Sequence, residues 1–117
     1  MSKTILIVDD EADVRTFLSA VCKKHGYRVV TAQNGAEGLE LARAERPALV
    51  VLDLVMPKQS GAEFYSALTK SGEFDDTPII VVSGLAARSA VVDDAVAVFD
   101  KPINPGEFIA AIEAALG

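Results

Sequence analysis

The stretch LVVLDLVMPK, Leu49–Lys58, decides the fold of this chain. It opens with an uninterrupted apolar run, which is typical of a strand covered on both faces in a parallel sheet. Asp53 then places a carboxylate directly after that run, and Pro57 follows four residues later. An unpaired charge in an apolar interior is strongly unfavourable or forces a pKa shift. The stretch therefore predicts a core strand that ends on a carboxylate with a partner or a chemical task.

Similar apolar runs recur along the chain and alternate with helical patterns. The strands that we expect are Thr4–Val8, Tyr27–Thr31, Ala48–Leu52, Pro78–Val82 and, from a weaker pattern, Ala95–Phe99. Three helices follow from apolar residues at helical spacing, namely Val14, Phe17, Leu18 and Val21; Gly61, Phe64, Tyr65 and Leu68; and Phe108, Ile109, Ile112, Ala115 and Leu116. A further helix, roughly Gly35–Ala44, ends before Pro47. About five alternations of strand and helix predict βαβ units, a parallel sheet and helices on both of its faces.

Length, charge and cysteine usage restrict the class of protein. The 117 residues suffice for one domain, and we assign all of them, 1–117, to it. The net charge of −6 argues against nucleic acid or an anionic membrane as the main partner. Cys22 is the only cysteine, so no intramolecular disulfide can form, and we expect a cytoplasmic protein. No apolar run approaches membrane-spanning length, and the first residues lack a signal-peptide core.

Polar side chains follow four of the expected strands at the point where each strand ends. They are Asp9, Asp10 and Glu11; Asp53; Ser83; and Asp100 with Lys101. Singly, these residues have ordinary explanations, such as a helix cap, a turn or a solvated rim. In a parallel sheet they gather at one edge, where ligands bind. The crowded carboxylates predict a hard divalent ion, best Mg²⁺. Asp53 can act there as a nucleophile that forms an acyl phosphate, with Lys101 and Ser83 neutralising phosphoryl oxygens.

Four motifs resemble the receiver domain of the two-component response regulator family. They are IVDDEAD (Ile7–Asp13), VLDLVMPKQSG (Val51–Gly61), IIVVSG (Ile79–Gly84) and FDKPINPGEF (Phe99–Phe108), in the family's order. The resemblance covers essentially the whole chain. It implies a flavodoxin-like α/β fold, doubly wound, with a five-stranded parallel sheet in the order 2-1-3-4-5 and five helices.

The resemblance also implies a role for each site residue. Asp53 would accept a phosphoryl group from a phosphohistidine on a sensor histidine kinase or a histidine phosphotransfer protein, giving an aspartyl phosphate. Asp10 and Asp53 would hold Mg²⁺ directly with the backbone carbonyl of Val55, and Asp9 would act through a water. Ser83 would bond a phosphoryl oxygen after activation and Lys101 would pair with the phosphate.

Three departures from the family pattern shape further expectations. Ser83 and Lys101 are 18 residues apart, about one helical turn closer than usual, so the fourth helix should be short, near Arg88–Asp94, or poorly ordered. Val98 stands where the family often has a mobile aromatic, and we expect Phe99 to belong to the core instead. In the family, the residues at the positions of Val55 and Leu85 flank the path of the hydrolytic water, and apolar side chains there offer it no hydrogen bond, which predicts slow autodephosphorylation.

The leading hypothesis is a single-domain response regulator in two-component or phosphorelay signalling, acting on a downstream target protein by protein contacts. It would be no enzyme beyond its own Mg²⁺-dependent phosphorylation and dephosphorylation, and a monomer or weak homodimer. The alternatives are a degenerate receiver that binds partners without phosphorylation and a receiver fragment of a longer regulator. An aspartate phosphatase would need DxDx[TV] on the first strand, and a flavodoxin-like cofactor binder would need an anion-friendly loop where this chain has three acids.

Overall fold

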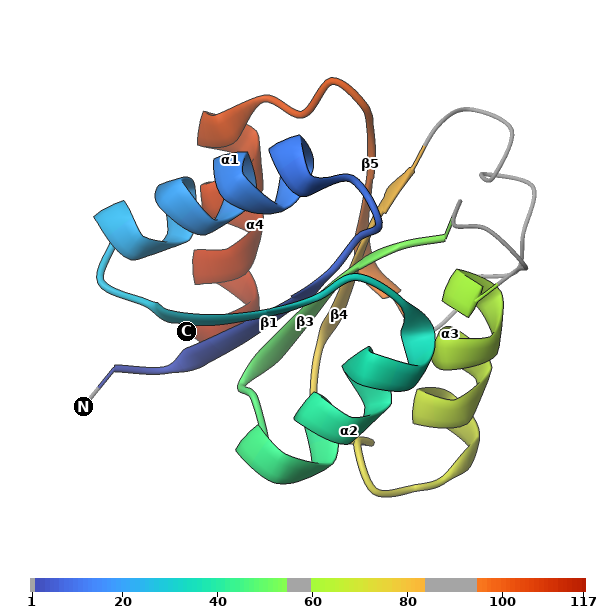
Figure 1. Ribbon diagram of the computed structural model, residues 1–117. Helices are drawn as coiled ribbons and strands as arrows, with labels where there is room; N and C mark the ends of the chain where they lie inside the picture. Colours follow the sequence, from blue (N-terminus) through green and yellow to red (C-terminus); the bar gives the residue numbers. More distant parts are fainter. Residues whose placement is uncertain (1, 55–59, 84–94) are drawn as a thin grey trace.

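The computed structural model describes residues 2–54, 60–83 and 95–117. Five parallel strands form one sheet in the order β2-β1-β3-β4-β5 (Figure 1). The strands are β1 (Thr4–Val8), β2 (Arg28–Ala32), β3 (Leu49–Asp53), β4 (Ile79–Ser83) and β5 (Ala95–Asp100). The expected flavodoxin-like order is therefore confirmed. Within the described ranges, no helix is both long and apolar enough to cross a bilayer.

The strand boundaries differ from the expected ones in a consistent direction. Only β1 has the predicted bounds, whereas β2, β3, β4 and β5 each end one residue further toward the carboxyl end. Asp53, Ser83 and Asp100 are thus the last residues of their strands rather than the first residues of loops. The ends of β3, β4 and β5 were predicted too early because each of these strands ends on a polar residue. A polar residue continues the backbone ladder as well as an apolar one, since only its backbone pairs. The consequence is that Asp53 is held by the ladder to β4, in register with Val82.

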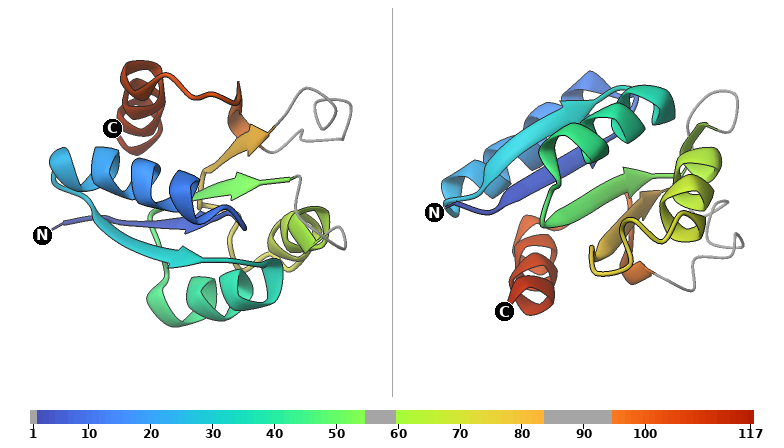
Figure 2. Two further views of the ribbon diagram at one scale, coloured as in Figure 1. Left: turned by 45° about the horizontal axis from the view of Figure 1, so that its top comes forward. Right: turned by 90° about the horizontal axis from the view of Figure 1, so that it is seen from below.

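The described helices cover both faces of the sheet (Figure 2). They are α1 (Ala12–Lys24), α2 (Gly35–Glu45), α3 (Ser60–Lys70) and α4 (Pro105–Leu116). Helices α1 and α4 pack on one face, and α2 and α3 pack on the other. The predicted fourth helix falls on residues 88–94, which lie outside the described residues.

Two separate apolar clusters explain why the strands read as continuous apolar runs. Successive side chains of a strand point to opposite faces, so both sets are buried when helices cover both faces. The β1 and β3 residues of the cluster under α1 and α4 are Ile5, Ile7, Leu49 and Val51. Those of the cluster under α2 and α3 are Leu6, Val8, Val50 and Leu52. All eight side chains are fully buried.

The structure places two aromatic residues, Phe99 and Phe17, in different environments. Phe99 packs edge-on against Phe108 of α4, with ring centroids 6.3 Å apart, so its expected place in the core is confirmed. Phe17 is one of the apolar positions that predicted a helix, and α1 is present there, but Phe17 itself is 42% exposed. The α1 residues that are buried in the core are Leu18 and Cys22. Phe17 is left as an apolar side chain on the outer surface of α1.

Gly61 brings the start of α3 against the end of β3. A Cβ atom at this position would lie 2.5 Å from the carbonyl oxygen of Asp53 and 2.7 Å from that of Leu54. Both are backbone atoms, so the contact can be relieved only by moving the helix or the strand end. Glycine is therefore required here by a close approach of two backbones.

We expect Gly61→Ala to lower the free energy of unfolding by about 2 kcal/mol, since overpacking a close contact costs roughly 1–3 kcal/mol. Urea unfolding followed by circular dichroism measures this loss. Gly106→Ala is the matched control, because the nearest atom to its added Cβ is the Asn104 side-chain oxygen at 3.3 Å. Equal stability of the two variants would contradict the close approach at Gly61.

Candidate functional site: an acidic cluster at the carboxyl edge of the sheet

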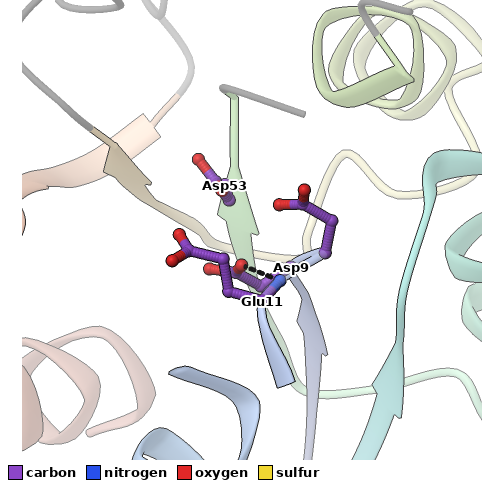
Figure 3. Close-up of side chains that lie close together, drawn as sticks. Asp9, Glu11 and Asp53 are labelled. Carbon is purple, nitrogen blue, oxygen red and sulfur yellow. Dashed lines mark hydrogen bonds between the residues drawn. The ribbon is translucent and has the colours of Figure 1, made fainter. Parts of the chain in front are cut away.

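Residues from three strand ends meet at the carboxyl edge of the sheet. Asp9 directly follows β1, Asp53 ends β3, and Lys101 directly follows β5. Figure 3 shows Asp9 and Glu11 beside Asp53 at the strand ends. The parallel topology accounts for this meeting, because it places the carboxyl end of every strand at the same edge. The strands are rigid and buried, so they hold these side chains in a fixed arrangement.

Four carboxylates lie together in this edge cluster. One oxygen from each of Asp9, Asp10, Glu11 and Asp53 lies within 4.8 Å of the others. Asp9 and Asp53 are buried, at 0% and 1% exposure, whereas Asp10 and Glu11 are exposed. Like charges at such distances repel, and burial weakens the solvent screening that would relieve the repulsion. The cluster therefore favours a cation.

Lys101 supplies part of the compensating positive charge. Its Nζ atom donates hydrogen bonds to Glu11 Oε1 at 2.6 Å and to Asp53 Oδ2 at 3.1 Å. The same atom lies 3.1 Å from Asp9 Oδ2. Partial burial lowers the pKa of Lys101, but the hydrogen bonds to Glu11 and Asp53 and the charges of Asp53 and Asp9 outweigh it and leave the pKa raised. Lys101 is thus a firmly protonated cation shared by three carboxylates.

Hydrogen bonds hold both the backbone and the carboxylate of Asp9 in place. Its N–H donates to the carbonyl of Ala32, and its own carbonyl accepts from Arg15 Nη1 at 2.7 Å. Asp9 Oδ1 accepts from the backbone N–H of Glu11 at 2.9 Å (Figure 3). Burial raises the pKa of the Asp9 carboxyl, although the Glu11 N–H and Lys101 act in the opposite direction. The protein holds a carboxylate in an environment that disfavours its charge.

The donor set fits a hard divalent cation. All four groups offer carboxylate oxygens, which are the ligands that Mg²⁺ prefers. Asp9 Oδ2 is buried and accepts no well-aligned hydrogen bond, even though Lys101 Nζ lies at ion-pair distance. A buried carboxylate oxygen left in this state is normally a costly defect. A cation among the four carboxylates would satisfy it and offset their repulsion.

The sequence prediction placed most of these residues correctly. Asp9, Asp10, Asp53 and Lys101 come together as expected. Ser83 ends β4 in register with Asp100, but its side chain lies outside what the structure describes, as does the whole of Val55. Leu85, expected near the path of the hydrolytic water, also falls outside the described residues.

Glu11 received no role from the sequence, yet it makes the shortest contact to Lys101. The signal was present in the third acid of DDEAD, which directly follows Asp9 and Asp10. Residues 11 and 101 are far apart in the sequence. The pair is seen only in the structure, where the segments that follow β1 and β5 lie at the same edge of the sheet. Arg15 likewise gains a specific contact, to the Asp9 carbonyl.

Comparison with known families identifies this arrangement. The family model described as "Response regulator receiver domain" matches residues 5–113. The chain belongs to the response regulator receiver domain family. This receiver domain is 31% identical over 116 residues to protein Rrf1 of Nitratidesulfovibrio vulgaris, covering 99% of this chain and 84% of Rrf1. It is 43% identical to protein PilH of Pseudomonas aeruginosa over 79 residues, covering 68% of this chain and 65% of PilH.

Solved structures show the same receiver fold. The response regulator TrrA of Thermotoga maritima, solved in complex with Mg²⁺ and BeF, is 32% identical, with a TM-score of 0.87 over 97% of this chain and 99% of that one. This receiver domain spans less than half the length of several transcriptional regulators that it matches.

Proposed function

We propose that this receiver domain is a phosphorylation-switched signalling module of the cytoplasm whose phosphoacceptor is Asp53. The observation that carries the proposal is the shared cation: Lys101 Nζ lies 3.1 Å from the carboxylates of both Asp53 and Asp9, which are buried. One charged group thus bridges the expected acceptor and an expected metal-binding acid. The Thermotoga relative supports the proposal, because its structure was solved in complex with Mg²⁺ and BeF.

The chemistry follows from the groups at the edge. A carboxylate oxygen of Asp53 forms a bond to phosphorus while the bond from phosphorus to the imidazole nitrogen of the donor breaks, and the electron pair leaves with the imidazole. Lys101 neutralises charge on the phosphoryl oxygens, and we assign the Ser83 hydroxyl the same role. Asp9, Asp10, Asp53 and the Val55 carbonyl would hold Mg²⁺, which supplies further charge neutralisation when bound.

The phosphoryl group would be lost slowly by hydrolysis. This part of the proposal rests on the apolar residues Val55 and Leu85, which offer no hydrogen bond to a hydrolytic water. The module would turn over no metabolite and would pass its signal by contacts with a downstream protein. In a phosphorelay, it would lose its phosphate mainly by transfer.

The outer surface of α1 is the docking face that we propose for the phosphoryl donor. Phe17 is 42% exposed there, and Arg15 lies on the same helix beside the edge cluster. An exposed aromatic side chain adds little to folding but often carries much of the energy of an interface.

We expect Phe17→Ala to lower the urea midpoint only modestly, because 42% of the surface of this residue is already exposed to water. Phosphotransfer from the cognate kinase should slow by about ten-fold, whereas phosphorylation by acetyl phosphate, which needs no docking, should keep its rate. Phosphotransfer assays with both donors measure the difference. An equal loss of rate with the two donors would show that the substitution perturbs the fold rather than docking.

The test of the function itself is phosphorylation by acetyl phosphate. The protein is incubated with acetyl phosphate and Mg²⁺, and its intact mass is read beside Asp53→Ala and a metal-free sample. A gain of one phosphoryl mass in the wild type alone supports the proposal. No gain at saturating Mg²⁺, with acetyl phosphate and with a histidine kinase, would leave a receiver that binds partners without phosphorylation.

A further inference from the structure

Lys101 is shared unequally among its three carboxylate partners. The shortest contact, at 2.6 Å, is to Glu11, and the contacts to Asp9 and Asp53 are both 3.1 Å. The Glu11 side chain is 58% exposed, whereas Asp9 and Asp53 are buried at the strand ends. Glu11 is therefore the one partner of the three that can swing into water without leaving a buried charge behind.

Glu11 occupies the start of α1, where its side chain could cap the helix but contacts Lys101 instead. Glu11 is the N-cap residue of α1, a place that favours a short side chain able to bond the first helical N–H groups. Its side chain makes no capping hydrogen bond, and it turns to Lys101 instead. Its backbone N–H meanwhile holds Asp9 Oδ1. The backbone of this residue thus orders the site, while its side chain is committed to the lysine.

We propose that Glu11 is a displaceable counter-ion for Lys101: it holds the lysine in the unphosphorylated protein and is expelled when a phosphoryl group takes its place. This inference rests on the proposed function of Asp53. Glu11 opposes phosphorylation in two ways, since it competes for Lys101 and repels an incoming phosphoryl dianion. It acts as a positioning residue that sets how readily the site accepts the phosphoryl group.

The exchange of partners balances without an added proton. With acetyl phosphate as donor, the Asp53 carboxylate bonds to phosphorus, the bond from phosphorus to the acetyl oxygen breaks, and acetate leaves with the electron pair. The phosphoryl oxygens take the Lys101 hydrogen bond that Glu11 accepted, and the Glu11 carboxylate is hydrated. Lys101 remains protonated throughout, as its raised pKa allows.

Glu11→Gln is the direct test, because it keeps the size of the side chain and the backbone bond to Asp9 while it removes the charge. At saturating Mg²⁺, we expect the phosphorylation rate with acetyl phosphate to rise about five-fold, the size of a partly exposed ion pair. The dissociation constant for beryllofluoride, followed by ¹⁹F NMR, should fall by a similar factor. A separate Mg²⁺ titration of each variant ensures that the metal is saturating in both measurements.

Two controls separate this role from general charge effects. Asp13→Asn removes the same charge from an exposed acid in the first turn of α1, and it should change neither readout by as much as two-fold. Lys101→Met removes the group for which Glu11 competes. In that background, the gain from Glu11→Gln should shrink to the part due to repulsion alone, so the two substitutions should be clearly non-additive.

The outcomes distinguish this inference from the proposed function. If the wild type is phosphorylated on Asp53 but Glu11→Gln and Asp13→Asn behave alike, the counter-ion role is wrong and the phosphoacceptor stands. An unchanged gain in the Lys101→Met background would also overturn it, because the effect would then not pass through the lysine. If the wild type neither gains a phosphoryl mass nor binds beryllofluoride, both proposals fail together.

Discussion

Replacing Lys101 by methionine should lower the free energy of unfolding of the metal-free protein by about 3 kcal/mol. The lysine is a cation in contact with two carboxylates, Asp9 and Asp53, that are almost wholly buried. Removal of one partner from a buried ion pair costs roughly 3–5 kcal/mol, since the charge left behind has lost its solvent and its partner. The partial exposure of Lys101, 22% for its side chain, places the expected loss at the lower end.

Urea unfolding in the presence of a chelator measures this effect, and addition of Mg²⁺ should recover a large part of the loss. The control is Arg28→Met, which breaks the exposed ion pair of Arg28 with Glu45. Such surface pairs contribute about 0–1 kcal/mol. A Lys101→Met protein as stable as Arg28→Met would show that the edge cluster relaxes without its lysine, and that the buried carboxylates are not the source of strain we infer.

The second large effect is stabilisation by Mg²⁺. A ligand that binds only the folded state stabilises it by RT ln(1 + [L]/Kd), or about 2.7 kcal/mol at a concentration 100 times Kd. Asp9→Asn should remove most of this response, because it takes away a buried carboxylate of the edge cluster. Thermal unfolding with and without Mg²⁺ measures it, with Ca²⁺ as a comparison ion. An equal response in wild type and Asp9→Asn would place the metal elsewhere.

The pH dependence of that response has a definite sign. Burial raises the pKa of Asp9 above its usual 3.8, so the metal-free folded state binds this proton more tightly than the unfolded chain does. The contribution of Asp9 to stability is therefore fully present below pH 3.8 and is lost as the pH rises through the folded pKa. Mg²⁺ needs the ionised carboxylate, so its stabilising effect should decline in the same window as the pH falls. Asp9→Asn should show neither trend.

Much of the fold could be predicted from local patterns because the same requirement is repeated at every strand. Continuous runs such as Ile5–Val8 and Leu49–Leu52 are needed only where both faces of a sheet are covered, and this predicts helices on both sides. The strand ends were less predictable, since Asp53 continues the ladder through backbone groups that carry no sequence signal. The exposure of Phe17 was also missed, because helical spacing counts apolar positions without locating the neighbour that buries them.

The site likewise has features that the sequence could predict and features that it could not. Asp9, Asp53 and Lys101 were predictable because topology alone brings strand ends together. The contact between Glu11 and Lys101 depends on the direction of a flexible side chain at a helix start, and neither spacing nor composition encodes that direction. The close approach at Gly61 was equally hidden, because a glycine after a loop is more often part of a turn than a point where two backbones meet.

The two apolar clusters share no residue, and the sheet separates them completely. Substitutions in non-adjacent parts of a protein combine almost additively. The layer beneath α1 and α4 can therefore accumulate changes without forcing compensation in the layer beneath α2 and α3. Duplicated copies of such a gene could therefore diverge in the α1 surface that we propose for docking while they keep the layer beneath α2 and α3, with Val50 and Leu52 of β3, unchanged.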